Sequence, residues 1–103
     1  MRCAPQLRQL LSDIQREVDG TKGRYILRQH GAAAEMTYSI LSPTRIIVDH
    51  TGVPNAMRGT GAGKALILRL VEDARAEGVT ITPLCPFVRA QAAKHPEWSD
   101  VFE

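Results

Sequence analysis

The strongest constraint in this sequence is a glycine-rich junction between a β-branched run and a long apolar repeat of helical period. Gly59, Gly61 and Gly63 alternate with other residues, and Arg58 and Lys64 add positive charge on either side. Glycine allows backbone N–H groups to turn inward where a side chain would interfere, and a following helix directs its positive dipole end to the same place. Such a junction predicts an anion site, most often one for phosphate.

Two common nucleotide-binding loops do not fit this spacing. A Walker loop needs a glycine five residues before its Gly-Lys pair and a hydroxyl after it, but Arg58 and Ala65 occupy those places. A dinucleotide fingerprint needs a third glycine where Lys64 or Leu66 stands, and it opens a parallel β-α-β unit. Another kind of nucleotide-phosphate binder remains a weaker alternative.

The length of 103 residues, with 44% hydrophobic and 23% charged residues, predicts a single domain of ordinary composition. A net charge of +2 with interspersed signs gives no reason to expect a nucleic-acid partner. No apolar run approaches the ~18 residues of a membrane span. Cys3 and Cys85 lie far apart, so we expect no structural disulfide and predict a cytoplasmic protein.

The periodicity of the chain changes once. Alternation with period two predicts four strands, joined by short turns into an antiparallel meander, over residues 12–18, 24–29, 34–40 and 45–51. Helical period then extends from residue 60 or 61 to Glu77, and a fifth strand follows over residues 79–83. Because a helix connects them, the fourth and fifth strands should be parallel. A second helix is predicted over residues 87–94, which completes an α+β domain.

Three further motifs accompany the glycine loop, in which Arg58, Gly61 and Gly63 follow the spacing Arg-x-x-Gly-x-Gly. They are His-Thr-x-Val-Pro at 50–54, Pro-Leu-Cys-Pro-Phe-Val at 83–88 and His-Pro-Glu-Trp at 95–98. Together they resemble the short, single-domain branch of the GNAT superfamily of N-acetyltransferases. The resemblance covers about residues 12–102, so we assign 12–103 to one GNAT-like domain and 1–11 to an extension that could form a short helix.

The resemblance implies a GNAT-like fold and an enzyme that moves acetyl from acetyl-coenzyme A to a primary amine, with a non-catalytic acyl-coenzyme A-binding module as the alternative. Loop amides would hold the coenzyme A pyrophosphate, and pantetheine would lie along residues 50–53. The implied coenzyme contacts are Thr51, Val53, Arg58, Gly59, Thr60, Gly61, Ala62, Gly63, Lys64, Cys85 and Phe87. No metal site is expected from isolated histidines and one cysteine at these spacings.

Cys85 and His50 are the predicted catalytic residues. The resemblance places Cys85 beside the thioester, where it would line the site or carry acetyl covalently; a small buried hydrophobe is the other interpretation. Histidine titrates near neutral pH and can take a proton from an acceptor ammonium. Alternation from Val48 predicts that His50 faces the same side of its strand. Glu35 and Asp49 are alternative bases.

Residues 19–23 alone separate the first two predicted strands, whereas larger GNAT enzymes insert two helices there to wall the acceptor pocket. We therefore expect an open, shallow acceptor side that suits a flexible protein tail or an exposed lysine. The acceptor itself is not identified by the sequence, and a monomer or weak homodimer is expected.

Overall fold

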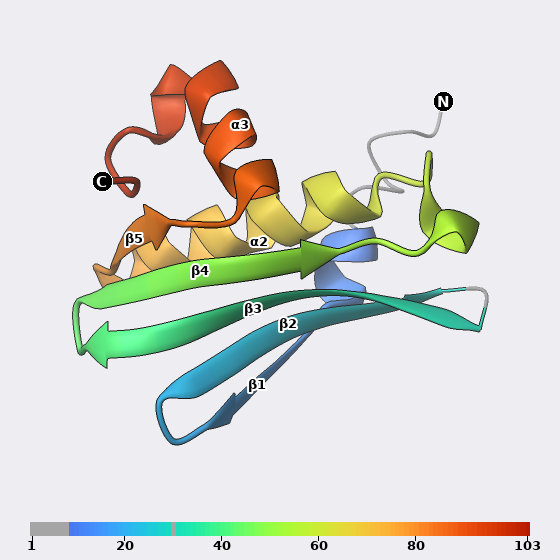
Figure 1. Cartoon of the computed structure of the whole chain (residues 1–103), viewed down its shortest axis with the longest axis horizontal. Helices are drawn as coiled ribbons and strands as arrows, with labels where there is room; N and C mark the ends of the chain where they lie inside the picture. The colour runs from blue at the N-terminus through green and yellow to red at the C-terminus, as the bar shows by residue number, and fades with distance from the viewer. Residues whose placement is uncertain (1–8, 30) are drawn as a thin grey trace.

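The chain forms a five-stranded sheet with a long helix against one face, as the computed structural model in Figure 1 shows. The structure describes residues 9–29 and 31–103. Its strands are β1 (Gln15–Asp19), β2 (Lys22–Gln29), β3 (Ala32–Ser42), β4 (Arg45–Gly52) and β5 (Thr80–Pro83). Its helices are α2 (Ala62–Glu77) and α3 (Pro86–Lys94), with 3₁₀ turns η1 (Asn55–Met57) and η2 (Pro96–Trp98).

The strand order is β1-β2-β3-β4-β5, and each neighbouring pair is antiparallel except β4 with β5, which is parallel. This arrangement confirms the predicted meander, crossover helix and parallel fifth strand. The crossover ends at Gly78, whose positive φ of 69° suits the left-handed position that follows a helix.

The first strand begins later than alternation predicts. Residues 9–13 are helical, and β1 starts at Gln15 rather than at residue 12. Ile14 lies between the two and is buried in the core. Its apolar side chain therefore belongs to the bend before the strand, which a period-two pattern cannot distinguish from a strand position. A short helix is predicted within the extension 1–11, of which residues 1–8 lie outside the described part of the chain.

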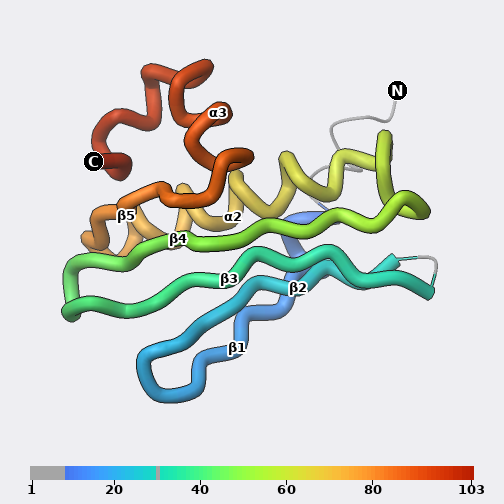
Figure 2. Tube along the Cα trace, in the orientation of Figure 1, coloured from blue at the N-terminus to red at the C-terminus, as the bar shows by residue number. Residues whose placement is uncertain are grey.

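The core lies between the sheet and α2. Tyr25 and Leu27 of β2 and Met36 and Tyr38 of β3 are fully buried on this face. The buried row of α2 is Ala65, Leu66, Ile67, Leu70, Val71 and Ala74, at the spacing of a helix lying on a sheet. We call this face the inner face and the opposite one the outer face. In the described chain no helix lies over β1–β3 on the outer face (Figure 2).

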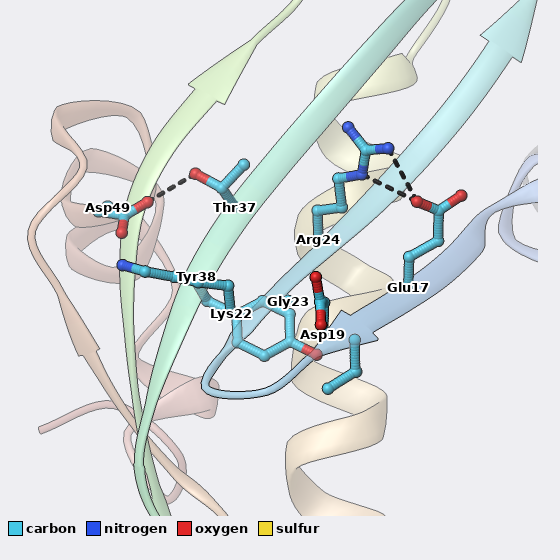
Figure 3. Close-up of a pocket in the computed structure, with 9 residues that line it drawn as sticks. Glu17, Asp19, Lys22, Gly23, Arg24, Thr37, Tyr38 and Asp49 are labelled. Atoms are coloured by element: carbon cyan, nitrogen blue, oxygen red, sulfur yellow. Dashed lines mark hydrogen bonds and ion pairs between the residues drawn. The ribbon is translucent and has the colours of Figure 1, made fainter.

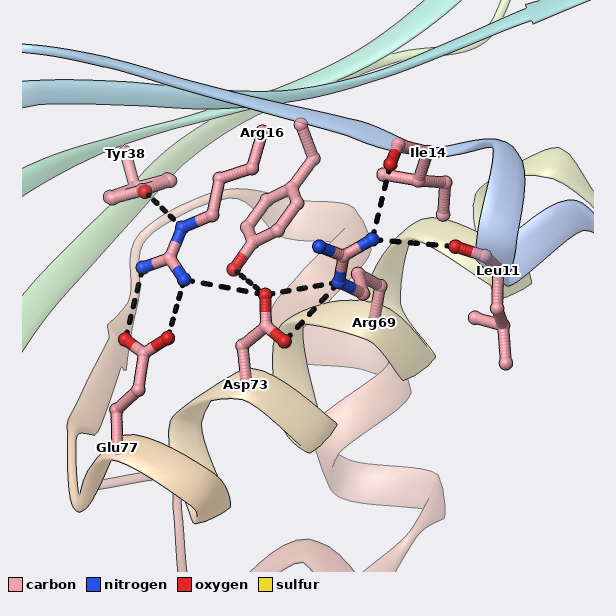
Figure 4. A network of polar contacts seen from close by, with 8 residues as sticks. Leu11, Ile14, Arg16, Tyr38, Arg69, Asp73 and Glu77 are labelled. Atoms are coloured by element: carbon pink, nitrogen blue, oxygen red, sulfur yellow. Dashed lines mark hydrogen bonds and ion pairs between the residues drawn. The ribbon is translucent and has the colours of Figure 1, made fainter.

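A polar network fastens the edge strand β1 to α2 (Figure 4). Arg16 donates to Glu77 Oε1 at 3.1 Å and to Asp73 Oδ2 at 3.4 Å. Tyr25 Oη donates to the same Asp73 oxygen at 2.8 Å, and Arg69 Nε donates to it at 3.1 Å. Burial, followed by the hydrogen bond to Asp73, raises the pKa of Tyr25 well above its usual range. The phenol therefore stays protonated and keeps donating.

The Arg16–Glu77 pair should make stability depend on pH. The Arg16 guanidinium holds the pKa of Glu77 below the ordinary value of 4.5. The stabilisation by the pair is therefore fully present above pH 4.5 and is lost as the pH falls through the lowered pKa of the folded protein. Because both side chains are partly exposed, we expect Glu77→Gln to cost about 1 kcal/mol or less at pH 7. Thermal unfolding measured from pH 7 to 3 should show this difference shrinking below pH 4.5.

Glu72→Gln is the matched control, since Glu72 is exposed on the same helix and forms no ion pair with a described residue. An unfolding difference for Glu77→Gln that is the same at every pH would contradict the pair as its cause.

The C-terminal segment pairs with the edge of β5 that faces away from β4. Ile81 N donates to Val101 O at 2.7 Å, and Glu103 N donates to Ile81 O at 2.9 Å. Trp98 is buried, and the His95 ring stacks on it with centroids 4.1 Å apart. These contacts hold α3 beside the β5 edge and so fix the position of its first residues.

Candidate active site

An opening lies where β5 separates from β4. The last paired residues of the two strands are Val48 and Pro83, while β4 continues to Gly52 with β3 as its partner. Leu84 N and Cys85 N both donate to Val48 O, at 3.0 and 3.1 Å, as the chain turns away. Because Pro83 has no N–H to donate, it suits the end of a ladder. The edge of β4 beyond Val48 therefore has no β5 neighbour.

One extra residue in β4 changes which side chains face outward. Tyr38 pairs with Val48 and Thr37 pairs with His50, which leaves Asp49 as a β-bulge. Residues paired across an antiparallel ladder point to the same face, so His50 shares the outer face with Thr37. The prediction that His50 faces the same side as Val48 is therefore wrong. The bulge is the physical reason, because it breaks the alternation.

A groove on the inner face lies between the end of β4, the glycine loop and α3. It has a volume of about 450 Å³. Its lining residues are Thr51, Val53, Met57, Arg58, Gly59, Gly61, Ala62, Gly63 and Phe87. We call it the inner groove. All of its lining residues except Met57 are among the coenzyme contacts implied by the sequence, and Met57 is fully buried in η1.

The three glycines are needed for different reasons. Gly59 and Gly61 have positive φ angles of 80° and 86°, which L side chains rarely adopt. Gly63 lies inside α2, and a Cβ there would be 3.1 Å from Phe87 Cζ and 3.6 Å from Val53 Cγ2. The absent side chain at Gly63 therefore allows the wall of the inner groove to close against α2.

The inner groove ends at the N-terminus of α2, which is the positive end of the helix dipole. Ala65 N donates to Gly61 O at 2.9 Å, so the amides that precede it in α2 are free of the helix's own bonds. The first turn of α2 has no acidic residue. Arg58 and Lys64 are exposed beside it, although Lys64 does not line the groove. Thr60 does not line it either, and its hydroxyl donates to Met57 O at 2.6 Å.

Cys85 stands at the inner side of the opening. It caps the start of α3, is 3% exposed, and lies with Sγ 3.3 Å from Thr51 Oγ1. Thr51 pairs with Met36, whose side chain is buried on the inner face. Cys85 is therefore associated with the inner face of β4, whereas His50 lies on the outer face. The structure does not bring the two predicted catalytic side chains together.

The candidate bases lie on the outer face. His50 is exposed, and a Cβ at Gly52 would be 3.3 Å from its Nε2, so Gly52 leaves room for the ring. Asp49 accepts a hydrogen bond from Thr37 Oγ1. Glu35 forms an ion pair with Arg24, with Oε1 and Nη1 3.6 Å apart. Asp49, which precedes His50 in β4, has no ion-pair partner among the described residues.

Within residues 9–29 and 31–103, no group of three or more His, Cys, Asp or Glu side chains is placed to hold a metal ion. No helix in this part of the chain has the length and apolar composition that crossing a membrane requires.

The family model of the GCN5-related N-acetyltransferases matches residues 24–101, which include most of β2, all of β3 to β5, the glycine loop, α2 and α3. The chain belongs to this family. A solved solution structure of a GCN5-like protein from Staphylococcus aureus, described as a candidate N-acetyltransferase, is similar with a TM-score of 0.65 and 30% sequence identity. The similarity covers 89% of this chain and 90% of that one. No curated protein matches the sequence closely enough to count as a relative.

Membership confirms the GNAT assignment, the acetyltransferase class and the α+β fold that the sequence predicts. The family supports acyl transfer as the general reaction.

Proposed function

We propose that this GCN5-related N-acetyltransferase moves acetyl from acetyl-coenzyme A to a primary amine at the exposed edge of β4. The observation that carries the proposal is the opening beyond Val48, where the edge of β4 has no β5 neighbour and Thr51 lines the inner groove; we propose that the acetyl group and the amine meet there. Acetyl-coenzyme A supplies the acetyl group as a thioester.

The residues of the inner groove suit the coenzyme. Free amides at the start of α2, with Arg58 and Lys64 nearby, favour the pyrophosphate. Val53 and Phe87 provide apolar walls for the pantetheine chain, and the unpaired edge of β4 offers backbone groups in place of a neighbouring strand. We further propose that a backbone N–H near Val53 polarises the acetyl carbonyl.

The two faces of β4 support direct transfer. A base on the outer face, for which we propose His50, takes the proton from an amine that arrives on that side. Cys85 is buried on the inner side and hydrogen-bonded to Thr51, so we propose that it lines the acetyl position without carrying acetyl. In this scheme the neutral amine nitrogen bonds to the acetyl carbon, the carbon–sulfur bond of the thioester breaks, and the second proton lost by the nitrogen leaves with coenzyme A as its thiol.

Release of free thiol from acetyl-coenzyme A, measured with a panel of amines, tests the scheme. General bases typically contribute about 10²–10⁴-fold, so His50→Gln should lower kcat about a hundredfold or more. Cys85→Ala should lower it only several-fold, and rapidly quenched wild-type protein should show no added acetyl by intact mass.

An acetylated wild type together with an inactive Cys85→Ala would instead establish a covalent route. Stabilisation by acetyl-coenzyme A without thiol release from any amine would favour the binding module. Competition between ATP and coenzyme A addresses the remaining alternative, a general nucleotide-phosphate site.

A further inference from the structure

The outer face carries a second groove, which the predicted coenzyme contacts do not use. Its volume is about 490 Å³. It lies over β1 to β4 and is lined, among others, by Glu17, Asp19, Lys22, Arg24, Thr37 and Asp49 (Figure 3). We call it the outer groove. Since no helix of the described chain covers β1–β3 on this face, a bound molecule can extend beyond the groove into solvent.

The strand register connects the outer groove to the candidate base. Glu17 pairs with Arg24, Arg24 with Thr37, and Thr37 with His50. These four residues form one row across β1 to β4 on the outer face. Adjacent strands are about 4.8 Å apart, so the row is roughly 14 Å long. A molecule lying along it from β1 reaches His50 at the exposed edge of β4.

Asp49 is the carboxylate at the His50 end of this row. Thr37 Oγ1 donates to its Oδ1, and Ser39 Oγ lies 3.5 Å from its Oδ2. No Lys, Arg or His of the described residues forms an ion pair with Asp49, whereas Glu17 is paired with Arg24 at 2.8 Å. Lys22 is linked to Asp49 only through Ser39, whose hydroxyl it contacts at 2.7 Å. The bulge thus presents the Asp49 carboxylate, oriented by hydroxyl groups, without an ion-pair partner among residues 9–29 and 31–103.

We propose that the acetyl acceptor enters along the outer groove and that Asp49 binds its ammonium group next to His50. The acceptor is then a primary amine on an unbranched alkyl chain, as in a lysine side chain or a polyamine. A charge-assisted hydrogen bond to Asp49 positions the ammonium, and His50 Nε2 takes its proton before the nitrogen attacks. The inference rests on the proposed function, because it assigns the second substrate of the same reaction.

The test measures amine and coenzyme binding separately. Spermidine and an N-terminally blocked peptide with one lysine serve as acceptors, and thermal shift measures acetyl-coenzyme A binding. Asp49→Asn should raise the amine KM about tenfold or more, with a much smaller fall in kcat. Lys22→Gln should lower the amine KM, because it removes a positive charge near the same carboxylate. Glu72→Gln, remote on α2, should leave both constants unchanged.

Acetyl-coenzyme A binding should remain within twofold of wild type in all three variants. An amine KM unchanged by Asp49→Asn overturns the inference, as does a wild type that binds acetyl-coenzyme A but acetylates neither probe. A wild type that is not stabilised by acetyl-coenzyme A refutes the proposed function instead, so the two failures are distinct. If the proposed function and this inference are both supported, the probe with the larger kcat/KM shows whether the acceptor amine belongs to a lysine side chain or to a polyamine.

Discussion

Gly61→Asp is expected to abolish the stabilisation that acetyl-coenzyme A gives to the wild-type protein. Gly61 immediately precedes α2, has a φ of 86° and lines the inner groove. An aspartate there places a carboxylate where the pyrophosphate is proposed to bind and opposes the positive end of the helix. In the wild type, ligand at a hundredfold above Kd should add about 2.7 kcal/mol of stability. Thermal unfolding with and without acetyl-coenzyme A measures the loss.

Gly61→Asn separates charge from backbone strain. Asparagine has nearly the same shape as aspartate and tolerates the left-handed conformation comparably, so both variants should lose similar stability without ligand. Only the aspartate should lose the response to ligand completely. Full ligand stabilisation of Gly61→Asp would exclude the glycine loop as the pyrophosphate site.

Gly23→Ala should produce the largest loss of stability in the sheet. A Cβ at Gly23 would lie 2.2 Å from Tyr38 Cζ and 2.5 Å from Tyr38 Oη, well inside van der Waals contact. The ring cannot easily move, because Tyr38 is 1% exposed and its hydroxyl accepts a hydrogen bond from Arg16 Nε at 3.0 Å. Overpacking of this kind costs about 3 kcal/mol, which corresponds to roughly 10–20 °C in Tm for a domain of this size.

Gly20→Ala is the control within the same hairpin. Gly20 has a φ of 63°, but nothing lies within 4 Å of its missing Cβ. An alanine there should therefore cost only the backbone strain, about 1 kcal/mol. If the two variants unfold at the same temperature, contact with the Tyr38 ring is not the reason for glycine at position 23.

The fold could be predicted largely because its signals are local. The change from period two to helical period and the terminating Gly78 are visible in short windows of sequence, and the helical connection makes β5 parallel to β4. The bulge at Asp49 is different, since it depends on how Thr37 and Tyr38 pair with β4. Alternation within β4 alone therefore assigned His50 to the wrong face.

The candidate site, like the fold, could be predicted from the sequence only in part. The inner groove could be anticipated from the glycine loop, because glycines with positive φ and a helix start are close together in sequence. Met57 was missed, since one apolar residue before the loop gives no distinguishing signal. The outer groove was also missed, because Glu17, Arg24 and Thr37 come from three strands and each resembles an ordinary solvent-facing position.

The bulge in β4 also has a consequence for inhibitors. A coenzyme mimic in the inner groove would occupy the inner face of the strand, and an amine mimic directed at Asp49 would occupy the outer face. The two could bind at once, and their effects would combine instead of competing. A single bisubstrate compound would need a linker that passes around the bare edge of β4 beyond Val48, where β5 has already turned away.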